Sequence, residues 1–142
     1  MKLFWKRLLR SEAVLYLVAG VLTTAVNFVC FHGLDLGLSR SGLSARMSYQ
    51  IAYAAAFFAA VIFAYWTNKF FVFRNFRLEP LYLLREFSGF FAARLVSGLL
   101  TFVLLVGFIE LLHFGHSLAW LSTTTVNLVF NYLASKFWIF KK

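Results

Sequence analysis

Residues 65–74 read Tyr-Trp-Thr-Asn-Lys-Phe-Phe-Val-Phe-Arg, and residues 132–141 read Tyr-Leu-Ala-Ser-Lys-Phe-Trp-Ile-Phe-Lys. Each copy has a lysine four residues after a tyrosine, then a run of large apolar residues, and then a cation. Each copy also ends a long apolar segment of the chain. An internal repeat of two membrane hairpins provides two half-sites that face one another near the bilayer midplane. The repeat therefore predicts two related hairpins, and it makes translocation across a bilayer the first functional hypothesis.

The composition indicates that most of this chain is surrounded by lipid. Of its 142 residues, 62% are hydrophobic, 20% are aromatic and only 13% are charged, and the mean hydropathy is +0.80. A soluble globule of this size buries only about two-thirds of the surface that its unfolded chain exposes, so it could not hide this much apolar surface from water. We therefore predict an all-α polytopic membrane protein with two repeated hairpins and no soluble domain.

Four segments are long and apolar enough to cross a bilayer, which takes about 20 largely apolar residues each. We expect them to form a single transmembrane domain over residues 1–142, which begins with a basic, amphipathic, cytoplasmic tail at residues 1–12. The start of this tail either lies flat on the inner leaflet as a short helix or continues the first span into the interface. The predicted spans cover about residues 13–34, 47–73, 86–112 and 117–140.

Turn-forming residues are expected to separate the helices of neighbouring spans. Glycines and serines are scattered over residues 33–42, between the first two spans. The only proline, Pro80, lies in the second connection, at residues 74–85. The third connection is a tight turn at residues 113–116, which contains Gly115.

The net charge of +9 is unevenly distributed, and this distribution predicts how the spans are oriented. Lysines and arginines gather in the N-terminal tail, around the middle connection and at the C-terminal end, while the other two connections hold only Arg40 and Arg46. By the positive-inside rule, both termini and the middle connection are predicted to be cytoplasmic. Because the cations lie at span ends, the expected partners are anionic membrane lipids or a phosphorylated ligand, rather than nucleic acid.

Polar residues recur at helical spacing inside three of the predicted spans, which places them on one face of each helix. A polar face in lipid is costly, so these faces should meet inside a bundle or line a cavity. Close packing between helices is the alternative role, and both interpretations stay open for the asparagines. The residues concerned are Asn27 in the first span, Arg94, Ser97 and Thr101 in the third, and Asn127 and Asn131 in the fourth.

Arg94 is the most unusual of these residues, because it lies well inside the third predicted span. An arginine near the bilayer centre costs at least about 2.5 kcal/mol, and its guanidinium group stays charged. A phosphate that enters from the inner leaflet is one candidate partner. The other interpretation is structural, with an ion pair to Glu86 or a side chain that extends to the inner headgroups.

Lys69 and Lys136 occupy equivalent positions in the two copies of the repeat, directly after Asn68 and Ser135. They either anchor the inner ends of their helices, as part of the positive-inside pattern, or bind a lipid headgroup. Together with the intramembrane polar residues they form the predicted site for a lipid phosphate and its headgroup. This site comprises Arg94, Lys69, Lys136, Asn68, Asn27, Asn127 and Asn131.

The sequence offers little catalytic chemistry. It has no glycine-rich phosphate loop, no paired catalytic carboxylates and no cysteine–histidine set with metal-ligand spacing. His113 and His116 have the spacing of two metal ligands, but two ligands in a solvated turn are weak evidence for a metal. We therefore expect no catalytic residue, no metal and no cofactor, and we predict that the protein is not an enzyme.

Three stretches resemble the GtrA-like family, whose members are small bacterial membrane proteins with four spans. In the first span, within residues 16–28, Gly20 is followed seven residues later by Asn27. The second span ends with the family-like pattern at residues 68–73. In the second hairpin the matching residues are Phe87, Arg94, Asn127, Asn131 and the ending at residues 135–140. The resemblance covers nearly the whole chain beyond the first ten residues.

The two halves depart from the family pattern in complementary ways. The second span has Ala64 where the fourth has Asn131, and the fourth has Ser135 where the second has Asn68. Each half thus keeps only one of the two asparagines that the family often shows. If both halves bind a headgroup, they cannot bind it in the same way.

The resemblance implies a role in cell-surface polysaccharide synthesis at the bacterial cytoplasmic membrane. It implies that the protein moves a polyprenyl-phosphate-linked sugar, such as undecaprenyl-phosphate glucose, to the outer leaflet, where a separate membrane glycosyltransferase uses it. A lipid-linked sugar flippase is therefore the leading hypothesis, and a homo-oligomer is expected because four helices make a thin pathway. The alternative is a non-transporting scaffold that anchors a polyprenyl-phosphate glycosyltransferase, since related four-span units occur fused to such enzymes.

Overall fold

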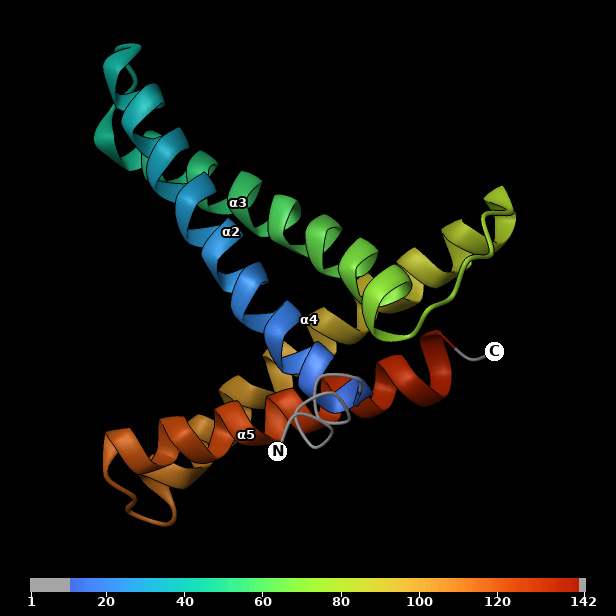
Figure 1. The fold of residues 1–142 in the computed structure, drawn as a ribbon. Coiled ribbons are helices and arrows are strands. Elements are labelled where there is room, and N and C mark those ends of the chain that lie inside the picture. Colours follow the sequence, from blue (N-terminus) through green and yellow to red (C-terminus); the bar gives the residue numbers. More distant parts are fainter. Residues whose placement is uncertain (1–10, 141–142) are drawn as a thin grey trace, which may run out of the picture. The chain divides into compact units, whose positions relative to one another are not determined.

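The computed structural model describes residues 11–140, and these residues contain helices and connections but no strand (Figure 1). The prediction of an all-α protein is confirmed. Residues 1–10, which were interpreted either as an amphipathic surface helix or as a continuation of the first span, lie outside the described residues, as do the cations Lys141 and Lys142. The helices are α2 (Glu12–Arg40), α3 (Ala45–Thr67), η1 (Asn68–Val72), α4 (Pro80–Glu110), α5 (His116–Ala134) and η2 (Ser135–Ile139).

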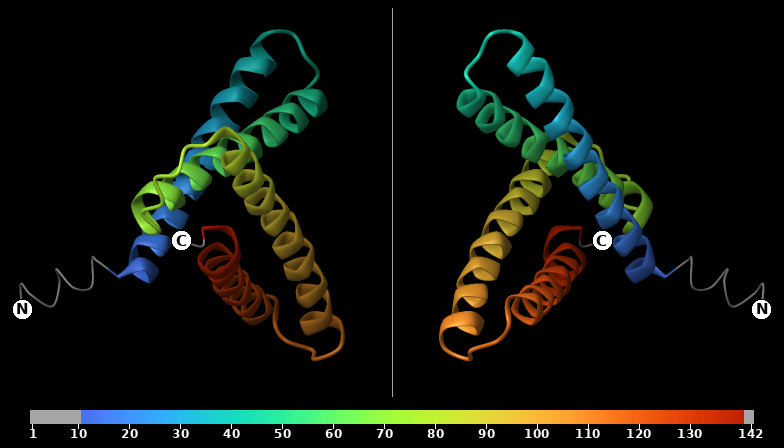
Figure 2. Two further views of the ribbon diagram at one scale, coloured as in Figure 1. Left: turned by 90° about the vertical axis from the view of Figure 1, so that its right-hand side faces the viewer. Right: turned by 90° about the vertical axis from the view of Figure 1, so that its left-hand side faces the viewer.

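The chain divides into two compact units, Met1–Phe76 and Arg77–Lys142. In the described residues, each unit is one helical hairpin, with α2 packed along α3 in the first and α4 packed along α5 in the second (Figure 2). The predicted pair of hairpins is therefore confirmed, and each hairpin can be understood from its own sequence.

The first hairpin owes its close packing to small side chains. Ser44 begins α3 as its N-cap and accepts a hydrogen bond from the backbone N–H of Met47. From there a residue is buried at every fourth position along α3, and nearly all of these residues are small. Small side chains at this spacing let two membrane helices approach closely. The buried series is Ser48, Ala52, Ala56, Ala60, Ala64 and Asn68.

Of the four helical segments within residues 11–140, three are long and apolar enough to cross a membrane, by length and composition: Glu12–Arg40, Ala45–Val72 and Pro80–Glu110. The fourth consists of α5, with 19 residues, continued by the five residues of η2. At about 1.5 Å per residue, this segment is also longer than the hydrocarbon core, which is about 30 Å thick. The chain is thus a polytopic membrane protein.

Two predicted connections are shorter than the sequence suggested. The expected break across residues 33–42 was wrong for Gly33 and Gly37, which lie inside α2, because glycine is tolerated within membrane helices. Gly42 does form the turn, with a φ of 91° that favours glycine. The expected break at residues 74–85 is also too long, since Pro80 begins α4, where its missing N–H costs no helical hydrogen bond.

Both copies of the repeat end in the same unusual backbone, a single π-helical turn. The N–H of Phe73 donates to the carbonyl of Asn68 at 2.9 Å, and the N–H of Phe140 donates to the carbonyl of Ser135 at 2.9 Å. Both phenylalanines are buried. The equivalence of the two copies therefore extends from sequence to backbone, and π-helical turns are frequent at functional sites.

Candidate functional site

A set of four hydrogen-bonded polar residues, here called the polar ladder, joins the two helices of the second hairpin. Asn131 donates from Nδ2 to the hydroxyl of Ser97 at 2.9 Å, and Asn127 donates from Nδ2 to the hydroxyl of Thr101 at 2.7 Å. The two asparagines also bond to each other, from Asn131 Nδ2 to Asn127 Oδ1 at 2.6 Å. The predicted polar faces of these two spans therefore meet inside a hairpin. The polar ladder comprises Ser97, Thr101, Asn127 and Asn131.

The hydroxyls of the polar ladder are satisfied in both directions. Ser97 donates to the carbonyl of Arg94 at 3.0 Å, and Thr101 donates to the carbonyl of Ser97 at 2.7 Å, while each accepts from an asparagine of α5. Ser97 and Asn131 are only 2% and 3% exposed. Unpaired polar groups are costly in such surroundings, so the network holds the two helices in one register.

That register continues from the polar ladder toward the start of α4. The pairs Thr101–Asn127 and Ser97–Asn131 advance by four residues in opposite directions along antiparallel helices. A Cβ atom on Gly89 would lie 4.0 Å from the Ile139 side chain, which continues the same series.

Arg94 lies near the middle of α4, 14 residues after Pro80 and 16 before Glu110. Its side chain is half-buried, and its guanidinium group lies over the Phe90 ring, 5.0 Å from the centroid. Phe90 in turn packs against Phe140, at 5.9 Å between ring centroids. Within residues 11–140, Arg94 forms no ion pair with a carboxylate. The ion pair with Glu86 that the sequence left open is therefore not formed.

The two repeat lysines differ in their surroundings. Lys69 is 0% exposed, and its Nζ donates to Asn75 Oδ1 at 3.3 Å. The backbone N–H of Asn75 donates back to the Lys69 carbonyl at 2.8 Å, so the chain folds over the end of η1. Lys136 is half-buried, and its Nζ donates to the hydroxyl of Tyr132 at 3.2 Å. Equivalent sequence positions thus give one enclosed ammonium group and one that is partly accessible.

The asparagines of the first hairpin are not joined in a network like that of the second. Asn68 is buried and donates from Nδ2 to the Ala64 carbonyl at 2.8 Å, while its Oδ1 has no hydrogen-bond partner among the described residues. Asn27 is half-buried and makes no hydrogen bond with its side chain in the described part of the chain. Of the seven predicted site residues, Asn27, Asn68 and Lys69 belong to the first unit, and Arg94, Asn127, Asn131 and Lys136 to the second.

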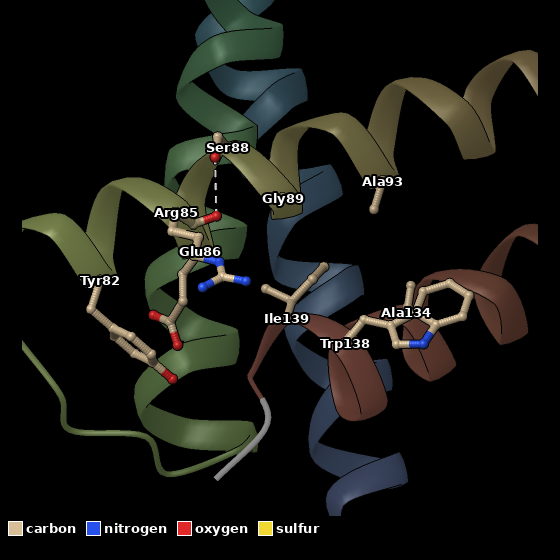
Figure 3. Close-up of a pocket in the computed structure, with 9 residues that line it drawn as sticks. All are labelled: Tyr82, Arg85, Glu86, Ser88, Gly89, Ala93, Ala134, Trp138 and Ile139. Carbon is tan, nitrogen blue, oxygen red and sulfur yellow. Dashed lines mark hydrogen bonds between the residues drawn. The ribbon is translucent and has the colours of Figure 1, made fainter.

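The second hairpin also contains a pocket of about 420 Å³ that was not predicted from the sequence. It lies between the first half of α4 and the end of the hairpin at η2 (Figure 3). Arg85, Gly89 and Ala93 recur at four-residue spacing on one face of α4, which was the signal in the sequence that could have indicated it. The lining residues are Tyr82, Arg85, Glu86, Ser88, Gly89, Ala93, Ala134, Trp138 and Ile139.

The polar ladder yields a prediction for stability. Removing the amide in Asn131→Ala should lower the free energy of unfolding by about 1–2 kcal/mol, within the range for hydrogen bonds between membrane helices. Ser97→Ala should cost less in the Asn131→Ala background than in the wild type, because the two side chains share a bond. Unfolding in mixed micelles, followed by circular dichroism, measures this difference. Strictly additive losses would contradict a direct Ser97–Asn131 interaction.

Within residues 11–140, no group of three or more histidine, cysteine, aspartate or glutamate side chains could hold a metal ion. Arg94, Lys136 and the polar ladder supply cations, amides and hydroxyls. Such groups can bind a phosphate and the hydroxyls of a polar headgroup.

Comparison with known proteins gives this chain clear relatives. The family described as "GtrA/DPMS, transmembrane domain" matches residues 15–140, and so spans both hairpins. The uncharacterized membrane protein YwcD of Bacillus subtilis is 32% identical over 128 residues, which cover 90% of this chain and 95% of that protein. The cell wall teichoic acid glycosylation protein GtcA of Listeria monocytogenes is 33% identical over 128 residues, covering 90% of this chain and 83% of GtcA. No solved structure matches.

Proposed function

Because this protein belongs to the GtrA/DPMS transmembrane-domain family, we propose that it serves the glycosylation of a bacterial cell-surface polymer by moving a polyprenyl-phosphate-linked sugar across the cytoplasmic membrane. The relatives named for teichoic acid glycosylation support the first part of this proposal. The second part, movement of the lipid, rests on the chemistry of the second hairpin. The protein acts as a carrier and not as an enzyme, and the sugar is transferred by a separate membrane glycosyltransferase.

The observation that carries the proposal is Arg94, a cation midway along a membrane span with no carboxylate beside it in the described residues. A charge at that depth is costly, and such residues in membrane proteins mark the paths of ions and substrates. A lipid phosphate would supply the missing anion. Guanidinium is well suited to it, because its planar fork can donate two hydrogen bonds to one phosphate.

The neighbouring residues would complete the path of the headgroup. Lys136, which is partly accessible, would provide a second cation at the end of the hairpin. The polar ladder lies one turn beyond Arg94 on α4, and its amides and hydroxyls could replace water around the sugar as the headgroup passes. Asn27 and Asn68, in the first unit, stay a prediction from the sequence as further headgroup ligands. The polyprenyl chain would remain in lipid throughout.

The orientation belongs to the same proposal. The positive-inside rule assigns both termini and the middle connection to the cytoplasm, so that Lys136 and the pocket at the start of α4 lie on the side where the lipid-linked sugar is made. Anionic lipids of the inner leaflet would then contact the cations at the helix ends. We also propose a homo-oligomer, because one pair of hairpins offers a narrow path for a headgroup.

Reconstitution tests the proposal directly. Purified protein in liposomes should exchange a fluorescent polyprenyl-phosphate sugar between leaflets at least about 10-fold faster than protein-free liposomes, equal to a barrier lowered by at least about 1.4 kcal/mol. Reduction of the fluorophore by a membrane-impermeant reagent reports the exposed fraction over time. Exchange no faster than in protein-free liposomes would overturn translocation. If the protein then still co-purified with a glycosyltransferase, a scaffold would be the better explanation.

A further inference from the structure

We propose that the pocket at the start of α4 binds the sugar ring of the lipid headgroup, with Trp138 as its stacking surface. This inference rests on the proposed function. It adds a sugar site that is separate from the proposed phosphate site, because neither Arg94 nor any residue of the polar ladder lines the pocket. The pocket volume of about 420 Å³ lies within the usual range for small-molecule sites, about 300–1,000 Å³.

The lining combines the chemical groups that a sugar requires. A sugar ring has a face of C–H groups and a rim of hydroxyls, so it is recognised by an aromatic surface together with hydrogen-bonding side chains. The Trp138 side chain is 76% exposed and borders the pocket, which makes an indole face available. Tyr82, Arg85 and Glu86 line the same pocket from the first two turns of α4 (Figure 3).

Glu86 is the residue that favours a neutral polyol over a phosphate in this pocket. Its side chain is buried, at 4% exposed, and it lines the cavity. A carboxylate repels a phosphate, but it accepts short hydrogen bonds from hydroxyl groups, and its two oxygens offer about four lone-pair sites. In a pocket that bound only phosphate, the carboxylate of Glu86 would weaken binding.

The position of the pocket relative to Arg94 fits a single headgroup. Arg94 follows Gly89 by five residues, or about 8 Å along the helix axis. Side chains of a helix lean toward its N-terminus, and the Arg94 guanidinium group lies over the ring of Phe90, which directly follows Gly89 in α4. A phosphate held by Arg94 would therefore present its attached sugar to the pocket, where Arg85 and Glu86 can contact the hydroxyls.

The floor of the pocket consists of small residues, Gly89, Ala93 and Ala134, and this suggests a sharp test. In Gly89→Phe the new ring would occupy the space of the sugar. Trp138→Leu would remove the stacking surface. Two matched controls lie outside the pocket: Gly98→Phe, where a Cβ would meet no atom within 4 Å, and Trp120→Leu, whose indole is also exposed.

Calorimetry in detergent would compare two probes, a short-chain prenyl phosphate and the same lipid carrying glucose, galactose or N-acetylglucosamine. We expect the wild type to bind at least one sugar-bearing lipid about 10-fold more tightly than the bare phosphate, because a site built for hydroxyls rejects a ligand that lacks them. Gly89→Phe and Trp138→Leu should reduce this preference to about twofold or less and leave the affinity for bare lipid phosphate unchanged. That unchanged affinity also shows that the variants are folded.

The possible outcomes separate this inference from the proposed function. If the pocket variants keep the wild-type preference, or if the controls lose it equally, the pocket is not the sugar site. If the wild type binds all lipids equally but loses them in Arg94→Gln, the sugar site is wrong and the phosphate site stands. If the wild type binds neither kind of lipid, the proposed function itself fails.

Discussion

Arg94→Gln should slow leaflet exchange of a polyprenyl-phosphate sugar by about 10- to 100-fold in reconstituted liposomes. A hydrogen bond to a charged group contributes about 1.5–3 kcal/mol, and each 1.4 kcal/mol corresponds to a factor of ten. Arg94→Lys should give an intermediate rate, because it keeps the charge but loses the planar fork. Stability should fall by no more than about 1 kcal/mol in Arg94→Gln, because the guanidinium group loses its contact with the Phe90 ring but has no carboxylate partner among the described residues.

The control for this experiment is another arginine in a membrane-spanning hairpin. Arg46 is exposed in the first turn of α3, so Arg46→Gln changes the net charge equally but should leave the exchange rate within about twofold of the wild type, a change below about 0.5 kcal/mol. Equal rates for Arg94→Gln and the wild type would remove the central support for translocation. Equal losses in both variants would indicate a general effect of charge rather than a phosphate site.

Lys69→Met should destabilise the protein by about 1.5–3 kcal/mol, because it removes a charged hydrogen-bond donor and leaves the buried Asn75 with one partner fewer. Lys136→Met should cost less, about 0.5–1.5 kcal/mol, because Lys136 is only half-buried and water can replace part of the hydrogen bond from its Nζ to Tyr132. Methionine is used because its length and flexibility resemble those of lysine without its charge. Unfolding in mixed micelles, monitored by circular dichroism, gives both values.

The two lysine variants should also differ in transport. When corrected for the amount of folded protein, Lys136→Met should slow leaflet exchange, whereas Lys69→Met should not. Equal stability in the two variants would contradict the structural role assigned to Lys69. A selective loss of transport in Lys69→Met, with its stability intact, would return Lys69 to the headgroup site predicted from the sequence.

The difference between these lysines shows that the repeat predicts the backbone of both copies but not the role of each side chain. The repeat correctly predicted matching backbones, and both copies end in a π-helical turn. It also suggested matching roles, but Asn75, which accepts the hydrogen bond from Lys69, corresponds to Lys142 in the second copy. A lysine cannot accept that bond. The two copies are thus distinguished by Asn75 and Lys142, which directly follow the similar stretches at residues 65–74 and 132–141.

The asparagines give a similar lesson within one hairpin. Helical spacing was enough to place Asn127 and Asn131 on one face of their span and Ser97 and Thr101 on one face of theirs. It could not tell which residue would meet which, or whether Arg94 would pair with Glu86. Those contacts depend on the register between α4 and α5, which the hydrogen bonds of the polar ladder fix and which the approach of Gly89 to Ile139 continues.

What this sequence determined by itself was the membrane environment, the repeated hairpins and the positions of polar residues along each span. These properties follow from local hydropathy and helical periodicity, which need no knowledge of distant residues. Only the tertiary structure decided that Lys69 is enclosed, that Arg94 lacks a carboxylate partner within the described residues, and that a pocket forms beside Trp138. These features arise from contacts between side chains in different segments of the chain. The periodicity of one helix does not specify which residues of another segment it will contact.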